Sequence, residues 1–196
     1  MQKSILSLIT CTALIAIVFA ACQDSGAAEK PKSIAMTNEE LVKRGSYLVS
    51  VIGCDDCHSP KRMGAHEPEI IPELRLSGYP SQLPYGKIDT AVVNQGWMMF
   101  TPDLTSAVGA WGQSFAANLT PDATGIGNWK EEQFIKALRE GKYKGLDNTR
   151  PLLPPMPWFV YKNMTDEDLK SIFAYLKSLK PVKNVVPAPR PYKKLN

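Results

Sequence analysis

The chain has 196 residues, and 44% of them are hydrophobic, which is enough to build one domain around a buried core. The formal net charge is +4, but residues 23–180 hold 18 basic and 19 acidic side chains, so the positive excess lies near the two ends of the chain. Because nucleic-acid binding requires a basic face on the folded body, this balance excludes a nucleic-acid partner.

Residues 1–21 have the pattern of a signal peptide, with Lys3 followed by an uncharged and mostly apolar run from Ile5 onward. The run ends in the segment VFAAC, which resembles the lipobox of bacterial lipoproteins, where the cysteine is acylated and becomes the new N-terminus. This resemblance implies a lipid on Cys22 that holds the protein at a membrane surface. The alternative is an uncleaved membrane helix, because the 18 residues from Ile5 to Cys22 are just long enough to span a bilayer. Both alternatives place the domain outside the cytoplasm, membrane-anchored on the periplasmic side.

Residues 22–36 are small and polar and include Pro31, which predicts a flexible tether between this anchor and the folded domain. The first helix is predicted to start at Thr37, because Glu40 follows three residues later and completes a capping box. Gly53 marks its end. The apolar positions that we expect to face the core are Leu41, Leu48, Val49 and Ile52.

The five residues CDDCH follow this helix directly. Two cysteines separated by two residues and followed by histidine form the attachment pattern of a c-type haem. Cys54 and Cys57 lie one helical turn apart, so their thiols can reach two vinyl groups on one porphyrin edge, and His58 can then bind the iron from below. A dithiol redox pair would require a strand before the motif, and a zinc site would require a second ligand pair, whereas His66 is the only other histidine. The motif therefore predicts one covalently bound haem.

A long stretch rich in proline and glycine occupies residues 59–127. Loops of this length are uncommon in compact domains and are usually functional or disordered. Trp97 and Phe100 argue against disorder, because such side chains are costly to leave in water. We expect an ordered insertion with at most a short hairpin, which either folds over the haem or completes the core.

Two further helices are predicted after the insertion. Asn128 begins the second in the same way as Thr37 begins the first, and Gly141 stops it. Thr165 begins the third, which carries apolar residues at helical spacing and ends before Pro181. Since no segment alternates strongly enough to indicate a major sheet, the fold class expected is all-α. The basic, proline-containing residues 181–196 are expected to form a solvated, flexible tail.

A sixth iron ligand decides whether the haem is open to small molecules. Met156 lies in the segment PLLPPMPW, where prolines hold the chain extended and stiff, so its thioether sulfur can be kept in place. Met98 and Met99 are reserve candidates from an apolar run. His66 follows His58 too closely to reach the opposite face of the ring. We therefore predict His58 and Met156 as the two axial ligands.

These motifs together resemble class I c-type cytochromes: a first helix that runs into CDDCH, a proline-framed methionine, and a last helix containing FAYL. The resemblance implies a domain over residues 37–180 with three main helices around one haem, and it implies that Gly45 meets Tyr175 where the first and last helices cross. The segments NLTPD and GIGNW also resemble a signature of cytochrome subunits from membrane-bound alcohol and aldehyde dehydrogenases.

The function that this resemblance implies is single-electron transfer between respiratory or periplasmic redox proteins, which dock transiently. We expect no catalytic residues and no small-molecule substrate, because two protein ligands on the iron leave no open position. Two alternatives stay open at this point. The chain can be the haem-bearing subunit of a dehydrogenase complex, or a haem sensor whose methionine is displaced by a ligand.

Overall fold

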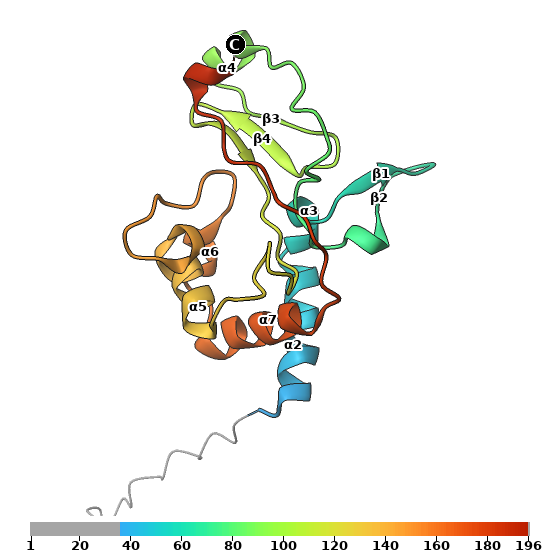
Figure 1. The fold of residues 1–196 in the computed structure, drawn as a ribbon, viewed down its shortest axis with the longest axis vertical. Helices are drawn as coiled ribbons and strands as arrows, with labels where there is room; N and C mark the ends of the chain where they lie inside the picture. The colour runs from blue at the N-terminus through green and yellow to red at the C-terminus, as the bar shows by residue number, and fades with distance from the viewer. Residues whose placement is uncertain (1–35, 196) are drawn as a thin grey trace, which may run out of the picture. The chain divides into compact units, whose positions relative to one another are not determined.

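The structure, a computed structural model, describes residues 36–195. The predicted signal peptide, and the predicted tether except for Met36, lie outside the described residues. Within the described part of the chain, no helix is both long and apolar enough to cross a membrane. Figure 1 shows α2, α5, α6 and α7 gathered at one end of this body, and small sheets formed by the segment between α3 and α5, with α4 beside the sheet at the other end.

Helix α2 (Asn38–Val51) starts as predicted. The Thr37 hydroxyl accepts a hydrogen bond from the backbone N–H of Glu40 at 3.3 Å, and the Glu40 carboxylate accepts the backbone N–H of Thr37 at 2.7 Å. The helix ends at its C-cap Ile52, and Gly53 adopts a left-handed conformation with φ 75°. This turn leads directly into the short helix α3 (Cys54–His58), so the attachment motif is held against the end of α2.

Helix α7 (Asp166–Ser178) crosses α2 at close range (Figure 1). A Cβ atom at Gly45 would lie 1.9 Å from the carbonyl oxygen of Ser171 and 2.7 Å from the Cβ of Tyr175, so only glycine allows this approach. The expected meeting of Gly45 with Tyr175 is therefore confirmed. The main core forms around this crossing and contains Val49, Leu76, Ile126, Phe134, Leu138, Leu169, Ile172, Phe173 and Leu176.

Helix α5 (Glu131–Glu140) starts later than predicted. Its N-cap is Lys130, which makes no side-chain capping bond, whereas the sequence had indicated Asn128. The predicted stop is confirmed, since Gly141 is left-handed with φ 63°. The remaining helical segments are short: α4 (Thr90–Asn94), α6 (Trp158–Tyr161), and the 3-10 turns η1 (Pro72–Leu74), η2 (Tyr143–Gly145) and η3 (Tyr192–Lys194).

The prediction of an all-α fold is wrong, because the insertion contains two antiparallel sheets. Strands β1 (Lys61–Met63) and β2 (Pro68–Ile70) form a hairpin. Strands β3 (Met99–Phe100), β4 (Ser106–Gly109) and β5 (Gly112–Phe115) form a three-stranded sheet in sequence order. No strand exceeds four residues among those described, and β4 (SAVG) is buried at every position, so neither sheet could show the alternation that marks a half-buried strand.

The C-terminal segment is fixed to the body, so the expectation of a solvated, flexible end is wrong for residues 181–195. Asn184 donates to the carbonyls of Ser77 and Tyr79 at 2.7 and 2.9 Å and accepts from the backbone N–H of Ser81 at 3.0 Å. Further along, Arg190 pairs with β5, and Leu195 is buried with Val93 and Val108 in a second, smaller core. In Figure 1 this segment, in red, runs back from α7 to the sheet β3–β4–β5.

Candidate functional site

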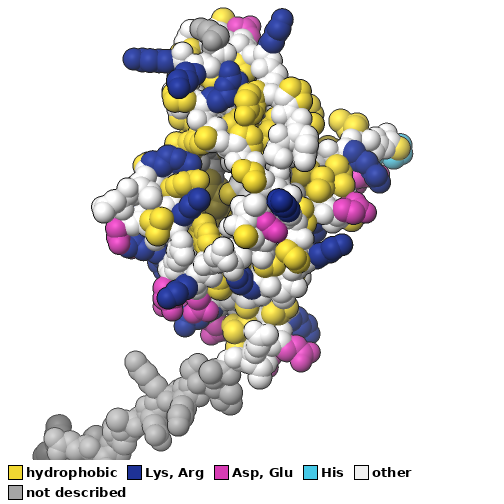
Figure 2. Space-filling view, in the orientation of Figure 1, with side chains coloured by type: hydrophobic (Ala, Val, Ile, Leu, Met, Phe, Trp, Pro, Cys, Tyr) yellow, Lys and Arg dark blue, Asp and Glu magenta, His cyan; other side chains and the backbone are white. Residues whose placement is uncertain are grey.

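One cavity of about 490 Å³ lies beside the main core, which is within the usual range for a ligand site. Figure 2 shows a recess bordered by hydrophobic side chains on this face of the molecule. Cys54, Cys57, His58 and Met156 all line the cavity, although the motif and the methionine are far apart in the sequence. The apolar residues that form much of the rest of its wall are Ile52, Leu119, Ile126, Trp129, Phe134, Leu138, Leu152, Ile172 and Leu176.

The two cysteines of α3 are free thiols in this structure. Burial raises the pKa of Cys54 to about 12, and burial together with the charge of Asp56 raises the pKa of Cys57. Dithiol redox catalysts depend on the opposite shift, a lowered pKa that provides a thiolate at neutral pH. The environment of these cysteines therefore disfavours the dithiol alternative.

The tautomer of His58 is determined by a backbone contact. Its Nδ1 lies 2.8 Å from the carbonyl oxygen of Ala117. A carbonyl can only accept, so Nδ1 carries the proton and Nε2 keeps its lone pair. Burial lowers the pKa of His58, and the hydrogen bond to Ala117 only partly opposes this effect. The imidazole is thus held neutral with Nε2 available, which is the form that binds a metal ion.

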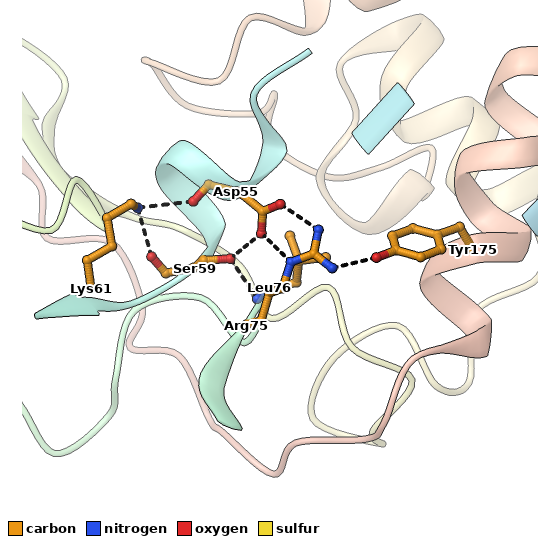
Figure 3. A network of polar contacts seen from close by, with 6 residues as sticks. All are labelled: Asp55, Ser59, Lys61, Arg75, Leu76 and Tyr175. Carbon is orange, nitrogen blue, oxygen red and sulfur yellow. Dashed lines mark hydrogen bonds and ion pairs between the residues drawn. The ribbon is translucent and has the colours of Figure 1, made fainter. Parts of the chain in front are cut away.

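A polar network anchors α3 from outside the cavity, and we call it the Asp55 network (Figure 3). The Asp55 carboxylate accepts two hydrogen bonds from the Arg75 guanidinium, at 3.0 and 2.7 Å, and one from the Ser59 hydroxyl at 2.6 Å. Arg75 in turn donates to the Tyr175 hydroxyl at 2.5 Å and lies over the Tyr175 ring. The network therefore joins the attachment motif, the insertion and α7.

Lys61 completes the Asp55 network at the C-terminal end of α3. Its ammonium group donates to the carbonyls of Asp55, Asp56 and Ser59 at 3.0, 2.7 and 2.9 Å, and to that of Asp103 at 3.2 Å. These carbonyls include ones left without partners where the helix stops, and a cation is favoured at that end of the helix dipole. The sequence did not identify Arg75, Lys61 or Tyr175 as partners of the motif.

The loop that carries Met156 is held by several backbone contacts. The N–H of Leu152 donates to the carbonyl of Gly141 at 2.7 Å, and the Ser114 hydroxyl of β5 donates to the carbonyl of Pro154 at 2.6 Å. The side chain of Met156 is partly buried against the main core. After the loop, the Tyr161 hydroxyl donates to the carbonyl of Ile52 at 3.1 Å and so joins the loop to the residues just before the motif.

The reserve ligand candidates lie elsewhere. Met98 is 48% exposed, and Met99 packs against the second core. His66 is exposed in the turn between β1 and β2. None of the three lines the cavity. The insertion that carries Met98 and Met99 nevertheless supplies one wall of the cavity through Leu104, β4 and β5.

The residues of the cavity fit a covalently attached haem. Two thiols lie one turn apart on α3, a neutral imidazole follows them, and a thioether from another loop lines the same apolar space. Thioether bonds need the thiols, and the iron needs the nitrogen and the sulfur. This set of donor atoms suits a haem better than it suits a zinc ion, which prefers four Cys, His or carboxylate ligands.

Comparison with known proteins agrees with this geometry. Residues 42–180 match the cytochrome c family. Similar curated proteins include the fructose dehydrogenase cytochrome subunit of Gluconobacter japonicus, 29% identical over 89% of this chain and 29% of that protein. The gluconate 2-dehydrogenase cytochrome c subunit of Pantoea cypripedii is 32% identical over 89% of this chain and 28% of that protein. The alcohol dehydrogenase (quinone) cytochrome c subunit of Gluconobacter oxydans is 26% identical over 74% of this chain and 23% of that protein. The chain thus spans less than a third of the length of these curated relatives.

Proposed function

Since this chain belongs to the cytochrome c family, whose members carry covalently bound haem c, we propose that it transfers single electrons through one haem held by Cys54, Cys57, His58 and Met156. The haem supplies a one-electron iron couple. The observation that carries the proposal is that these four side chains line one cavity, with the tautomer of His58 already suited to iron. Covalent attachment by the two cysteines would keep the group in place in both oxidation states.

The residues around the haem would determine which molecules reach the iron and what its reduction potential is. If His58 and Met156 both held the iron, no open coordination site would remain for a substrate, which favours an electron carrier over an enzyme. Methionine ligation stabilises the reduced state, and the apolar wall of the cavity does the same by excluding water. The hydrogen bonds that join the Met156 loop to Gly141 and Ser114 hold this methionine in place. They therefore support a raised reduction potential of the haem.

The partner that we infer is an oxidoreductase outside the cytoplasm. The relatives named above include cytochrome subunits of fructose and gluconate dehydrogenases, which favours a dehydrogenase as electron donor. A subunit role is therefore the second candidate, with the same haem chemistry inside a stable complex. Size-exclusion chromatography of the protein from its native membranes distinguishes the two, because a subunit would elute with a catalytic chain and a free carrier would elute alone.

We also infer that the protein is held at a membrane by a lipid on Cys22. The support is the sequence VFAAC and the small, polar composition of residues 22–36, which would give the domain room to reach its partners. An uncleaved N-terminal helix is the competing form of attachment.

The ligand assignment is tested by replacing Met156. In the haem-loaded Met156→Ala protein we expect loss of the thioether-to-iron charge-transfer band, binding of carbon monoxide by the reduced form, and a lower reduction potential, because the sixth position is opened. Met98→Ala is the matched control, since it removes an exposed methionine outside the cavity, and it should leave all three properties unchanged. A Met156→Ala spectrum identical to that of the unmodified protein would place the sixth ligand elsewhere.

A further inference from the structure

The charged side chains that line the cavity carry positive charge. No aspartate or glutamate is found among the described residues that line the cavity, whereas Lys144 and Arg150 both contribute to it. Lys144 is exposed, so water can solvate its ammonium group, but Arg150 is only partly exposed. A cation beside an apolar cavity is unfavourable unless an anion or a dipole compensates it.

Within the part of the chain that the structure describes, few groups compensate the charge of Arg150. One Nη atom donates to the carbonyl of Pro151 at 2.9 Å, and the guanidinium lies 4.0 Å from the centre of the Tyr143 ring. Among residues 36–195, the ion pairs do not include Arg150, in contrast to Arg44, Arg62, Arg75 and Arg139. Burial accordingly lowers the pKa of Arg150. Most of the N–H donors of this guanidinium therefore lack an acceptor among the described residues.

The loop nevertheless holds Arg150 in a defined position. The N–H of Tyr143 donates to the Arg150 carbonyl at 3.0 Å, so the stacked ring and the arginine belong to one closed turn. The Thr149 hydroxyl bonds within the same turn, to the carbonyls of Tyr143 and Leu146 at 2.8 and 2.7 Å. A guanidinium stacked on an aromatic ring in a braced turn is pre-organised to receive a planar anion.

We propose that Arg150 is the carboxylate-binding residue of this cavity and that it pairs with a propionate group of the haem. The inference rests on the proposed function, because that function supplies the haem. A haem carries two propionates, and the planar fork of arginine matches a carboxylate with two parallel hydrogen bonds. Arg150 lies in the chain segment that leads to Met156, so one loop would supply both an iron ligand and the neutralising charge.

The test uses the haem-loaded protein and compares Arg150→Gln with Arg62→Gln. Arg62 is exposed in the β1–β2 hairpin and pairs with Glu69, so its replacement removes the same charge away from the cavity. We expect Arg150→Gln to shift the ferrous-to-ferric ratio about three- to tenfold toward the ferric state, where tenfold corresponds to 59 mV for one electron. The reason is that the uncompensated propionate then stabilises the more positive iron. Arg62→Gln should shift the ratio less than twofold.

A second readout tests direct contact. The propionate bending band in the resonance Raman spectrum should move in Arg150→Gln, move less in Arg150→Lys, which keeps the charge but loses the fork, and stay in place in Arg62→Gln. A shift in potential without movement of this band would reduce Arg150 to a distant charge and overturn the proposal, as would equal effects of Arg150→Gln and Arg62→Gln. If Arg150→Gln does not accumulate as a haem-loaded protein, Arg150→Lys is compared with Arg62→Gln instead. A propionate band that does not move in Arg150→Lys would then overturn the proposal.

Failure of this proposal can be told apart from failure of the proposed function. The charge-transfer band of the unmodified protein reports on Met156 and does not depend on Arg150. If that band is present and the propionate band is indifferent to Arg150, only the carboxylate assignment is wrong. If the band is absent from the unmodified protein, the axial ligand assignment is wrong whatever Arg150 does.

Discussion

Asp55 lies between the two attachment cysteines but, unlike them, does not line the cavity. The carboxylate is 14% exposed, and its partner Arg75 is 32% exposed, so water screens this ion pair only in part. The pair is bidentate and is extended by Ser59 and Tyr175. Such geometry makes it stronger than an ordinary surface pair. Its role is to fix the orientation of α3 and thus of the thiols and the imidazole.

Replacement of Asp55 by Asn tests this role. The variant keeps the size of the side chain but removes the charge, and it should lower the free energy of unfolding of the haem-loaded protein by about 1–2 kcal/mol, because Arg75 loses its anion in a partly buried place. Denaturant titration provides the measurement. Asp56→Asn is the control from the same turn, since Asp56 is exposed and its side chain has no ion pair among the described residues, so the change should be within about 0.5 kcal/mol. Equal losses in the two variants would refute the anchoring role of Asp55.

At the scale of single residues, the sequence predicted the groups that line the cavity but not those that orient them. Cys54, Cys57 and His58 form a local motif, and Met156 has a distinctive proline frame. Arg75 and Tyr175 lie 20 and 120 positions from Asp55, and nothing in their neighbours marks them as partners of the motif. The acceptor for His58 is the backbone carbonyl of Ala117, and a carbonyl has no residue-type signature at all.

Among the elements, the crossing of α2 and α7 sets the arrangement of the core. Gly45 brings the two backbones together, since any side chain there would overlap the carbonyl of Ser171. Val49 follows one turn later on the same helix and is fully buried, with 0% of its surface exposed. The glycine is thus required by packing rather than by its own backbone conformation, because helical φ and ψ angles suit every residue but proline.

Gly45→Ala should therefore destabilise the protein although alanine is the better helix former. Helix propensity alone would stabilise the variant by about 1 kcal/mol, whereas forced separation of packed helices costs about 1–3 kcal/mol or more. We expect a net loss and a lower Tm in thermal unfolding followed by circular dichroism. Ser50→Ala, on the exposed side of α2, supplies the comparison and should change stability little. An increase in Tm for Gly45→Ala would show that the helices can part without cost.

The start of a helix was predicted correctly where a capping residue precedes apolar residues at helical spacing. The start of α5 and the strands of the insertion were not predicted correctly. Thr37 and Thr165 each bond to the backbone three residues on, and both helices start where expected. Asn128 had the right residue type but does not cap α5, because the turn after Ile126 continues to Trp129, whose N–H bonds to the Ile126 carbonyl. The strands of the insertion were missed because their stability comes from burial by distant segments, which a local pattern does not contain.

For the whole molecule, the tail is the largest departure from what the composition indicates. Proline and lysine suggested a solvated end, yet Asn184 is buried, with 7% of its surface exposed, and makes side-chain hydrogen bonds to Ser77, Tyr79 and Ser81. The side-chain amide of Asn184 thus bonds to backbone groups that, in a regular strand, would bond to the backbone of a neighbouring strand. A single asparagine in a polar stretch gives no sign of this role, so the contact could be known only from the fold.

Attachment of the whole protein to a membrane is tested by Cys22→Ser. Serine cannot take the acyl chains, so the variant should move from the membrane fraction to the soluble fraction of cells while its haem spectrum stays unchanged. Cys11→Ser, within the same apolar run, serves as the control and should remain with the membrane. Retention of Cys22→Ser in the membrane fraction would favour the uncleaved helix.

The anchoring of the tail also has a consequence for the order in which the chain can fold. The contacts of Asn184 join residues 103 to 107 positions apart, so the segment near Tyr79 cannot reach its final partners until the residues around Asn184 have emerged. Cys54 and Cys57 emerge much earlier, while that segment still lacks the tail that will hold it. Loops of this length close slowly compared with helix formation, which separates early assembly around α2 from late closure of the insertion. The attachment motif therefore has an interval of exposure before the wall formed by the insertion is fixed, and that interval ends only when Asn184 makes its contacts.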